Sequence, residues 1–289
     1  MPYFKKENVQ IYYEDIGQGV PIIATHGLME DGRYWSETGV TAKITEKYRM
    51  IPLDMRAHGR TIVDGKPFGF NADTMADDID ALADFLEIDR FHLLTHATGG
   101  MVGVRYAMTK SDRLISLILT DTGSATIPEF YINEANRPEP TEEVNAAWTK
   151  WISTGFFEDA FKEFRRHPGE YLFKMDEHPD SEEMWKIYEG FFKNIDPQEV
   201  IKFRSVFYSD LDPRIDGLRQ IKCPTLILLG EFDIVFLKPS EIMANNIPDV
   251  RHIIIDGIGH MTAIEAPERT TKEILNFLEI VEQTGKANK

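Results

Sequence analysis

Cysteine is nearly absent from this chain of 289 residues, and it has neither long apolar runs nor an excess of positive charge. The single cysteine, Cys223, excludes a disulfide within the chain, and its place before Pro224 and an apolar segment predicts a small buried side chain. No stretch approaches the roughly 18 uninterrupted apolar residues of a membrane span. The first residues lack the apolar core of a signal peptide, so we expect a cytoplasmic protein that does not bind a membrane.

The charge balance argues against nucleic acid as a partner. Lys and Arg number 32 against 48 Asp and Glu, which gives a formal net charge of -16. Interfaces with a phosphate backbone need clustered Lys and Arg. The apolar content of 42%, with 11% aromatic residues, is that of an ordinary globular chain with a packed core. The sequence does not exclude a homo-oligomer.

Motifs for common cofactors and metals are also missing. The chain has no G-x-x-x-x-G-K-[ST], no G-x-G-x-x-G that follows a strand and opens a helix, and no H-E-x-x-H. His92 and His96 are four residues apart, but they lie on an expected strand and its exit, where that spacing places them roughly 13 Å apart. We therefore expect neither a cofactor nor a metal.

Short apolar segments alternate with amphipathic ones along most of the chain. Such alternation predicts an α/β fold with a mostly parallel central sheet flanked by helices. Because several of these strands are rich in apolar residues on both faces, we expect helices on both faces of the sheet. The expected strands are Pro21–Thr25, Tyr48–Asp54, Phe91–Thr95, Leu114–Thr120, the run from Thr225 to Gly230, and Val250–Asp256, with helices over Pro239–Asn246 and around Ile274–Val281.

The alternation stops for about a hundred residues, where aromatic and acidic side chains recur at helical spacing. We interpret this region as an all-helical cap inserted into one domain. The expected boundaries are 1–123 for the first part of the core, 124–222 for the cap and 223–289 for the second part of the core. The acidic residues of the cap are most simply a solvated face, which would disfavour polyanionic ligands.

Residues 93 to 100 read Leu-Leu-Thr-His-Ala-Thr-Gly-Gly, an apolar strand that runs into a turn and a helix. The pattern is that of a nucleophile elbow, G-x-S-x-G, with Ala97 at the serine position and Thr95 at the first glycine. An elbow is a strained turn that lifts one reactive atom above the sheet, and a methyl group is not reactive. The segment predicts a site without its attacking atom.

Four segments in order resemble the α/β-hydrolase fold superfamily over nearly the whole chain. His26-Gly27-Leu28 resembles its oxyanion segment, the run from Asp54 to Thr61 resembles its D-x-R-G-H-G-x-S loop, the elbow follows, and Asp233 and His260 close the series. Ala57, Thr61 and Thr95 depart from the pattern without threatening the chemistry. The resemblance implies an α/β-hydrolase fold with a Ser-His-Asp triad, and Ala97 removes its nucleophile.

The resemblance also assigns the remaining roles. His260 is the expected base and Asp233 its expected acid partner, with Asp121 as the competing acid. The backbone N–H groups of Leu28 and Thr98 are the expected oxyanion donors. His96 is assigned to packing of the elbow, His26 to bracing of the oxyanion loop, and Trp35 to the core. The expected substrate contacts are Gly27, Met101, Trp148, Trp151 and Trp185.

Three functions remain open. The favoured one is a serine hydrolase for a fairly apolar or aromatic ester, lactone or related acyl compound, present as a nucleophile-lacking form that holds substrate without turnover. The second is a natural ligand-binding or receptor protein on the same fold. The third is a cofactor-free dioxygenase or lyase in which a His-Asp pair abstracts a proton and Ala97 is harmless. Family members with an elbow aspartate are also open, although Thr-Gly-Gly after position 97 resembles esterase-like and perhydrolase-like members that carry serine.

Overall fold

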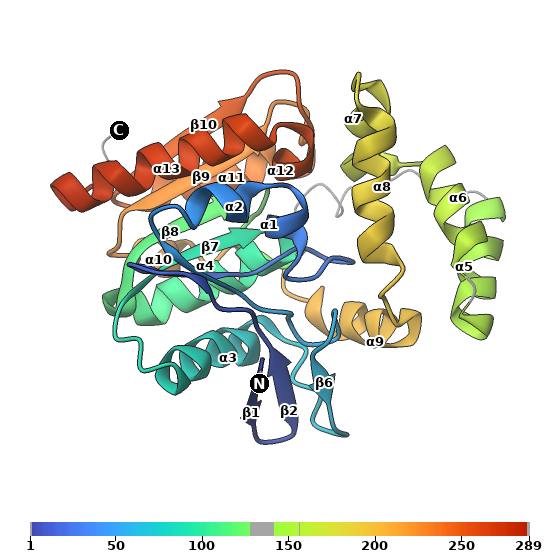
Figure 1. The fold of residues 1–289 in the computed structure, drawn as a ribbon, viewed down its shortest axis with the longest axis horizontal. Helices are drawn as coiled ribbons and strands as arrows, with labels where there is room; N and C mark the ends of the chain where they lie inside the picture. The colour runs from blue at the N-terminus through green and yellow to red at the C-terminus, as the bar shows by residue number, and fades with distance from the viewer. Residues whose placement is uncertain (1, 128–141, 156, 288–289) are drawn as a thin grey trace.

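A seven-stranded sheet forms the centre of the molecule (Figure 1). The structure is a computed structural model that describes residues 2–127, 142–155 and 157–287. The strand order is β10-β9-β8-β7-β4-β5-β3, and all neighbours are parallel except β3 and β5. The strands are β3 (Ile16–Gly17), β4 (Pro21–Ala24), β5 (Arg49–Pro52), β7 (Phe91–His96), β8 (Leu114–Thr120), β9 (Thr225–Gly230) and β10 (Val250–Ile255). All six expected strands are present, with ends that differ by at most two residues.

Helices cover both faces of this sheet, as predicted from strands that are rich in apolar residues on both faces. Successive strand residues point into different cores, so that Leu93 joins one apolar cluster and Leu94 the other. The first face carries α3 (Ala72–Phe85), α4 (Ala97–Lys110), α10 (Ile215–Leu218) and α11 (Leu237–Asn246). The second carries α1 (Tyr34–Glu37), α2 (Val40–Ile44) and α13 (Pro267–Thr284), with α12 (Thr262–Glu265) leading into α13. Trp35 is fully buried and its Nε1–H donates to the Thr25 carbonyl at 2.9 Å, which confirms its place in the core.

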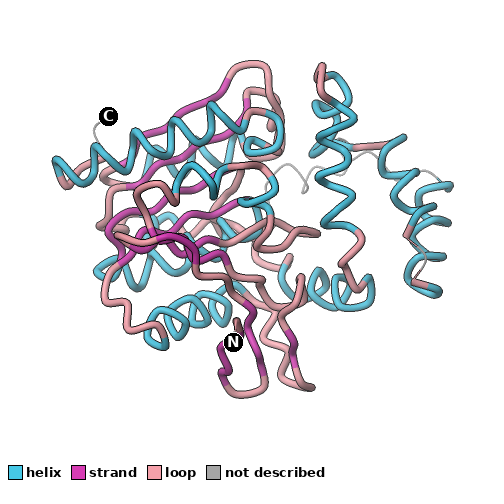
Figure 2. The backbone as a smooth tube through the Cα atoms, viewed as in Figure 1, coloured by secondary structure: helices cyan, strands magenta, loops and turns pink. Residues whose placement is uncertain are grey.

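A small antiparallel sheet near the N-terminus was not predicted. It comprises β1 (Tyr3–Lys6), β2 (Val9–Tyr12) and β6 (Ile62–Val63). Its strands have at most four residues, and β6 has two, too few for an alternating pattern to register. Figure 2 shows this sheet as the short magenta segments beside the N-terminus.

Five helices form a group beside the sheet, at the right of Figure 1. They are α5 (Glu142–Thr154), α6 (Glu158–Arg166), α7 (Gly169–Glu177), α8 (Ser181–Phe192) and α9 (Pro197–Phe207). Their interior is aromatic, with Trp151 stacked on Phe192 at 4.5 Å between ring centroids. Residues 128–141 and 156 of the expected cap lie outside the described residues. None of the helices that the structure describes has the length and apolarity to cross a membrane.

Candidate active site

The segment from β7 into α4 forms the expected sharp elbow. Ala97 is the first residue of α4, is 6% exposed and has φ 46, in the left-handed region. A residue with a side chain adopts this conformation at a penalty of about 1–2 kcal/mol. The register of β7 and β8 pairs His96 with Thr120, so Ala97 and Asp121 leave the sheet on adjacent strands, and Asp121 also has a positive φ of 52. Ala97 and Asp121, the residues that follow these two strands, therefore lie close together.

Thr95 fits the elbow because the facing helix α4 has a glycine opposite its side chain. Its Oγ1 donates to the Ile118 carbonyl at 2.9 Å, and its methyl lies over Gly103 of α4. A Cβ placed on Gly103 would be 2.7 Å from the Thr95 Cγ2. The departure at position 95 is therefore accommodated by the absence of a side chain at position 103.

The structure places Asp233 beside His260. The Nδ1–H of His260 donates to the Asp233 Oδ2 at 3.0 Å, and both residues are buried. Asp233 follows β9, and its Oδ1 also accepts the Phe236 N–H at 3.3 Å. The His260 ring stacks on Phe236 at 5.4 Å and meets the edge of Tyr171 at 4.8 Å. This pairing leaves the Nε2 of His260 for a second partner, as a general base requires.

Two features fix the loop that carries His260. Glu265 of α12 accepts the N–H of Gly259 at 2.7 Å and the N–H of Met261 at 3.0 Å, so its carboxylate bridges both sides of the histidine. Burial raises the pKa of Glu265 against the opposite effect of these hydrogen bonds. At the end of β9, a Cβ on Gly230 would overlap the Gly259 carbonyl oxygen, so only glycine lets the loop pass this close.

The expected oxyanion donors lie on two segments in contact. Thr98 is the second residue of α4, where an amide has no acceptor within the helix. The Leu28 amide donates to no acceptor in the described parts of the chain. A Cβ on Gly27 would lie 3.2 Å from the Ala97 Cβ, so the oxyanion segment passes directly against the elbow. His26 braces this segment, because its Nδ1–H donates to the Gly27 carbonyl and its Nε2 accepts the Met55 N–H.

Sequence reasoning missed a buried group of charges beneath the elbow. The Nε2 of His96 is 3.4 Å from Oε1 of Glu30, and its Nδ1 is 3.2 Å from Oδ2 of Asp121. Burial alone would lower the pKa of His96, but the charges and hydrogen bonds of the two carboxylates outweigh it and raise the pKa to about 10. Burial raises the pKa of Asp121. The sequence feature that could have indicated this group is Glu30, an acidic residue three positions after Gly27 in a segment without a neighbouring Lys.

The dyad and this group together offer ligand atoms to a cation. One atom each from Asp121, Asp233 and His260 lie within 4.8 Å of one another in the described part of the chain. Asp233 and His260 bond each other, and Asp121 Oδ2 accepts from the Thr262 hydroxyl at 2.6 Å and faces His96, whereas the buried Oδ1 of Asp121 has no hydrogen-bond partner among the described residues. The contacts serve the internal structure of the site.

The aromatic residues expected at the pocket lie inside the cap. Trp148 packs on Trp151 at 5.1 Å, and Trp185 packs edge-on against Phe161 while its Nε1–H donates to Asp176 at 2.7 Å. Met101 is 2% exposed in the core cluster that α4 shares with α3. Of the five expected substrate contacts, Gly27 is the one that the structure brings against Ala97 and His96.

Two cap tyrosines that the sequence did not single out reach the site. Tyr171 of α7 covers the ring of His260. Tyr208, which ends α9, shares a hydrogen bond of 2.6 Å with the Thr98 hydroxyl. Burial raises the pKa of Tyr208 to about 12, so its phenol stays protonated near neutral pH. The Thr98 hydroxyl is therefore tied to the cap.

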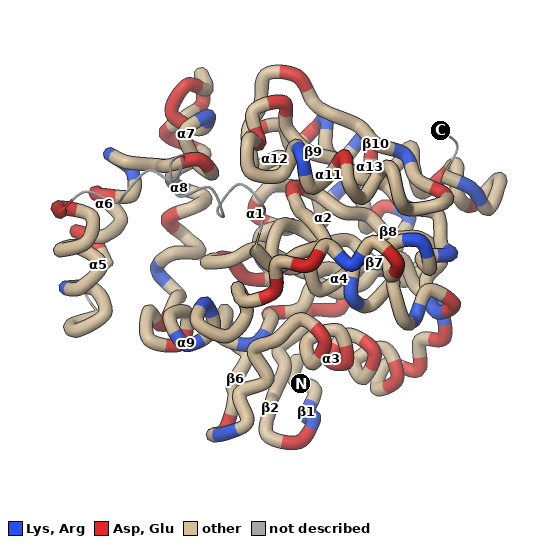
Figure 3. The backbone as a smooth tube through the Cα atoms, turned by 180° about the vertical axis from the view of Figure 1, so that it is seen from behind, with Lys and Arg blue, Asp and Glu red and all other residues tan. Residues whose placement is uncertain are grey.

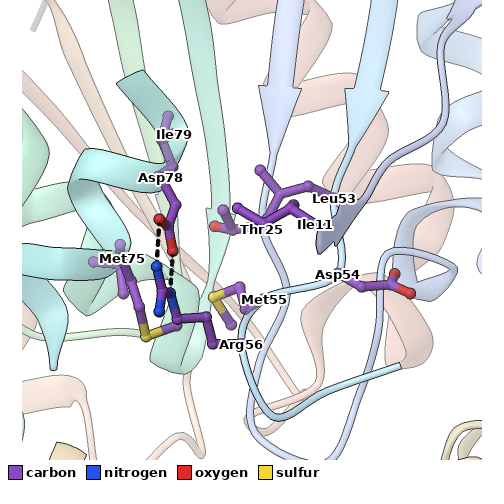
Figure 4. Close-up of a pocket in the computed structure, with 10 residues that line it drawn as sticks. Ile11, Thr25, Leu53, Asp54, Met55, Arg56, Met75, Asp78 and Ile79 are labelled. Carbon is purple, nitrogen blue, oxygen red and sulfur yellow. Dashed lines mark hydrogen bonds and ion pairs between the residues drawn. The ribbon is translucent and has the colours of Figure 1, made fainter. Parts of the chain in front are cut away.

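A small cavity lies elsewhere, between β4, β5 and α3 (Figure 4). Its volume of about 10 Å³ is close to the space of one water molecule. On its wall, the Arg56 guanidinium donates to both oxygens of Asp78, at 2.6 and 2.9 Å. This pair joins the D-x-R-type segment to α3 and is structural.

Comparison with known proteins gives a consistent family. A model described as alpha/beta hydrolase fold matches residues 20–267. A non-heme chloroperoxidase of Kitasatospora aureofaciens is 26% identical over 94% of this chain and 97% of its own length. A thermophilic esterase of Thermogutta terrifontis is 26% identical, with TM-score 0.70 and 94% of each chain covered.

A third relative, Est816, is described as an N-acyl homoserine lactone degrading enzyme. It is 25% identical, with TM-score 0.72, and the match covers 96% of this chain and all of that one. The family match spans the six parallel strands of the sheet, the elbow and the histidine loop, that is, every segment on which the site is built. The chain therefore belongs to the alpha/beta hydrolase fold family, as a hydrolase-type member.

Proposed function

We propose that this chain binds a fairly apolar ester, lactone or related acyl compound in a serine-hydrolase site that lacks its nucleophile. The observation that carries the proposal is the buried pair of His260 and Asp233, 3.0 Å apart, beside an elbow with Ala97 at its apex. An oriented imidazole with a free Nε2 serves to accept a proton from a hydroxyl. The alanine methyl has no such proton, so a bound acyl compound forms no covalent intermediate.

The serine-bearing form would act by acyl transfer. A hydroxyl at position 97 would give its proton to Nε2 of His260 while its oxygen attacks the acyl carbon. The N–H groups of Leu28 and Thr98 would hold the negative oxygen of the tetrahedral intermediate. Collapse would release the alcohol with the proton from His260, and water would cleave the acyl-enzyme by the same route. No cofactor or metal takes part.

Two further observations support the ligand class. The dyad is covered by aromatic rings, Tyr171 at the edge and Phe236 on the face of His260, which favours an apolar acyl or alcohol group nearby. Relatives named for esterase activity and for lactone degradation match along almost the whole chain. Ester hydrolysis breaks an acyl–oxygen bond, and an N-acyl homoserine lactone contains such a bond in its ring.

The test restores the missing hydroxyl. Ala97→Ser, the unaltered chain and Ala97→Ser combined with His260→Ala are compared on a panel of aryl esters and lactones. Loss of a triad serine lowers turnover by about 10⁶-fold, so we expect the serine variant to exceed the unaltered chain by at least about 10³-fold and the double variant to lose that gain. No gain from serine would reject the proposal in favour of a ligand-binding protein or a cofactor-free His-Asp enzyme.

A binding measurement tests the other half of the proposal. We expect the unaltered chain to bind, by calorimetry, the same ester that Ala97→Ser hydrolyses, and to release it intact by chromatography. An ester that the serine variant hydrolyses but the unaltered chain does not bind would contradict the holding function.

A further inference from the structure

We propose that His96 is a positioning residue, an imidazolium that forms ion pairs with Glu30 and Asp121 and thereby holds the oxyanion segment and the His260 loop around position 97. His96 touches no substrate in this scheme and acts through the two loops. Its effect on catalysis rests on the proposed function, whereas the linkage itself does not.

Both nitrogens of His96 face acceptors. Nδ1 lies 3.1 Å from Oγ1 of Thr120 and 3.2 Å from Oδ2 of Asp121, and Nε2 lies 3.4 Å from Oε1 of Glu30. The Thr120 hydroxyl donates to the Thr95 carbonyl, so toward His96 it accepts. A neutral imidazole has only one N–H and would leave a carboxylate facing a lone pair. Since the ring is fully buried, water cannot relieve that contact, and a proton on each nitrogen places positive charge between the two carboxylates.

Each carboxylate continues into a loop of the site. The other oxygen of Glu30, Oε2, accepts the Gly27 N–H at 2.6 Å, one residue before the expected oxyanion donor Leu28. Oδ2 of Asp121 accepts the Thr262 hydroxyl at 2.6 Å, two residues after His260. Glu30, His96 and Asp121 therefore link the two loops beneath the elbow. The link begins at Gly27 of the oxyanion segment and ends at Thr262 of the His260 loop.

The ring itself is held in place. Tyr34 of α1 stacks on His96 at 4.3 Å with an interplanar angle of 10°, and the ring of His260 lies 5.3 Å away. The charged and titratable groups around His96 are thus Glu30, Asp121, Tyr34 and His260. Because the ring is fixed between two carboxylates, it holds the two loops in place relative to each other. Supporting hydrogen-bond partners behind reactive groups have the same role in other sites.

His92 provides the internal comparison. It lies on the same strand and is equally buried, but its Nδ1 meets the Ser116 hydroxyl at 2.7 Å and the ring has no carboxylate partner among the residues that the structure describes. Burial lowers the pKa of His92 to about 3, so it is neutral. Burial on β7 alone therefore does not produce a charged histidine, and the carboxylates at positions 30 and 121 make the difference.

The first experiment measures the protonation of His96 in the unaltered protein. In ¹⁵N-histidine-labelled protein at pH 8.5, we expect one of the eight histidines to show both ring nitrogens protonated and to be missing from the spectrum of His96→Gln. Glu30→Gln should remove or weaken the imidazolium signal. A spectrum at pH 8.5 with neutral rings only would overturn the proposal.

The second experiment measures the linkage without catalysis. By amide hydrogen exchange, His96→Gln should loosen both the segment around residues 26–30 and the segment around residues 258–264, whereas His92→Gln should loosen neither. Glu30→Gln and Asp121→Asn serve the same purpose if His96→Gln does not fold, and each should loosen the loop that it contacts. Changes confined to β7 would overturn the proposal.

The third experiment reads the catalytic consequence in the Ala97→Ser background. A misplacement of about 1 Å lowers rates by about 10²-fold, so we expect His96→Gln to lower kcat by about ten- to a hundredfold with KM within about threefold. His92→Gln should leave both within about twofold of the Ala97→Ser parent. Equal kinetics for the two histidine variants would contradict the positioning role. An inactive Ala97→Ser would reject the proposed function, and the spectral and exchange results would still decide on His96.

Discussion

Two alanines occupy backbone conformations that favour glycine. Ala97 has φ 46 at the elbow, and Ala57 has φ 67 in the segment that resembles D-x-R-G-H-G-x-S, at the position of its first glycine. The strain at Ala97 belongs to the site, because the turn brings residue 97 to the oxyanion segment. The strain at Ala57 serves a turn held by Asp54, whose carboxylate accepts the amides of Gly32 and Arg60 at 2.8 Å each.

Ala57→Gly should therefore stabilise the protein. Removing the Cβ relieves a left-handed penalty of about 1 kcal/mol, partly offset by the greater entropy of glycine in the unfolded chain. We expect the free energy of unfolding in urea to rise by about 0.5 kcal/mol. Ala81→Gly, within helix α3, is the matched control and should lower it by about 1 kcal/mol. A loss of stability in both variants would show that Ala57 is not strained.

The charge on His96 predicts a pH dependence. The pKa of His96 rises from an unfolded value near 6.5 to about 10 in the folded protein, so its stabilising contribution is complete below pH 6.5 and disappears as the pH rises through 10. We expect the difference in unfolding free energy between the unaltered chain and His96→Gln to be largest near pH 6.5 and to shrink towards pH 10. Urea titrations at pH 6.5, 8 and 9.5 measure it. A difference that is constant or grows with pH would contradict a charged His96.

At the scale of elements, the packing of β7 on α4 shows how the elbow tolerates its altered first residue. The Thr95 methyl fills the space over Gly103, where a Cβ would come within 2.7 Å. We expect Gly103→Ala to destabilise the protein by about 1–2 kcal/mol, since overpacking outweighs the better helix propensity of alanine.

A double-mutant cycle isolates this contact. Thr95→Ser removes the methyl and keeps the hydroxyl that donates to the Ile118 carbonyl. In that background Gly103→Ala should be neutral or stabilising, which gives a coupling energy of about 1 kcal/mol or more. Additive effects in chemical denaturation would mean that Thr95 and Gly103 do not compete for space.

The elements also show what the sequence could reveal. Buried parallel strands such as β7 and β9 are rich in apolar residues on both faces, and the elbow and the histidine loop have distinctive local patterns, so the sheet, the elbow and the pairing of two strand-end residues could be predicted. The N-terminal strands are too short to give a pattern. The ion pairs of His96 with Glu30 and Asp121 join residues 66 and 25 positions apart, and no local sequence pattern predicts such a contact. Each of these three residues can be identified in the sequence, whereas only the folded structure shows that they lie together.

At the scale of the whole molecule, residues of α7 and of the end of α9 lie against the dyad and the elbow. Tyr171 covers His260, which is 6% exposed, and Tyr208 ties the end of α9 to Thr98. Acidic residues are spread over α3 and over the cap helices α5 to α7, with Lys and Arg between them (Figure 3). The charged surface faces outward while the cap presents aromatic rings to the site.

Removal of the Tyr171 ring should give solvent better access to His260. We expect Tyr171→Ala to speed the exchange of the C2 hydrogen of His260 with solvent deuterium, measured by mass spectrometry of the peptide that contains it. Tyr188→Ala is the control, because its ring packs on Trp185 within the cap. Equal exchange in the Tyr171 variant and the unaltered chain would mean that the cap does not limit access to the dyad.

Covalent labelling at position 97 tests most directly whether the site is a hydrolase site without its nucleophile. Intact-protein mass spectrometry of Ala97→Ser after treatment with a fluorophosphonate should show a single adduct, located by peptide mapping at residue 97, because labelling requires a hydroxyl activated by His260. The unaltered chain and the variant that also carries His260→Ala should remain unlabelled. A serine variant that folds like the parent and gains no adduct would contradict the claim.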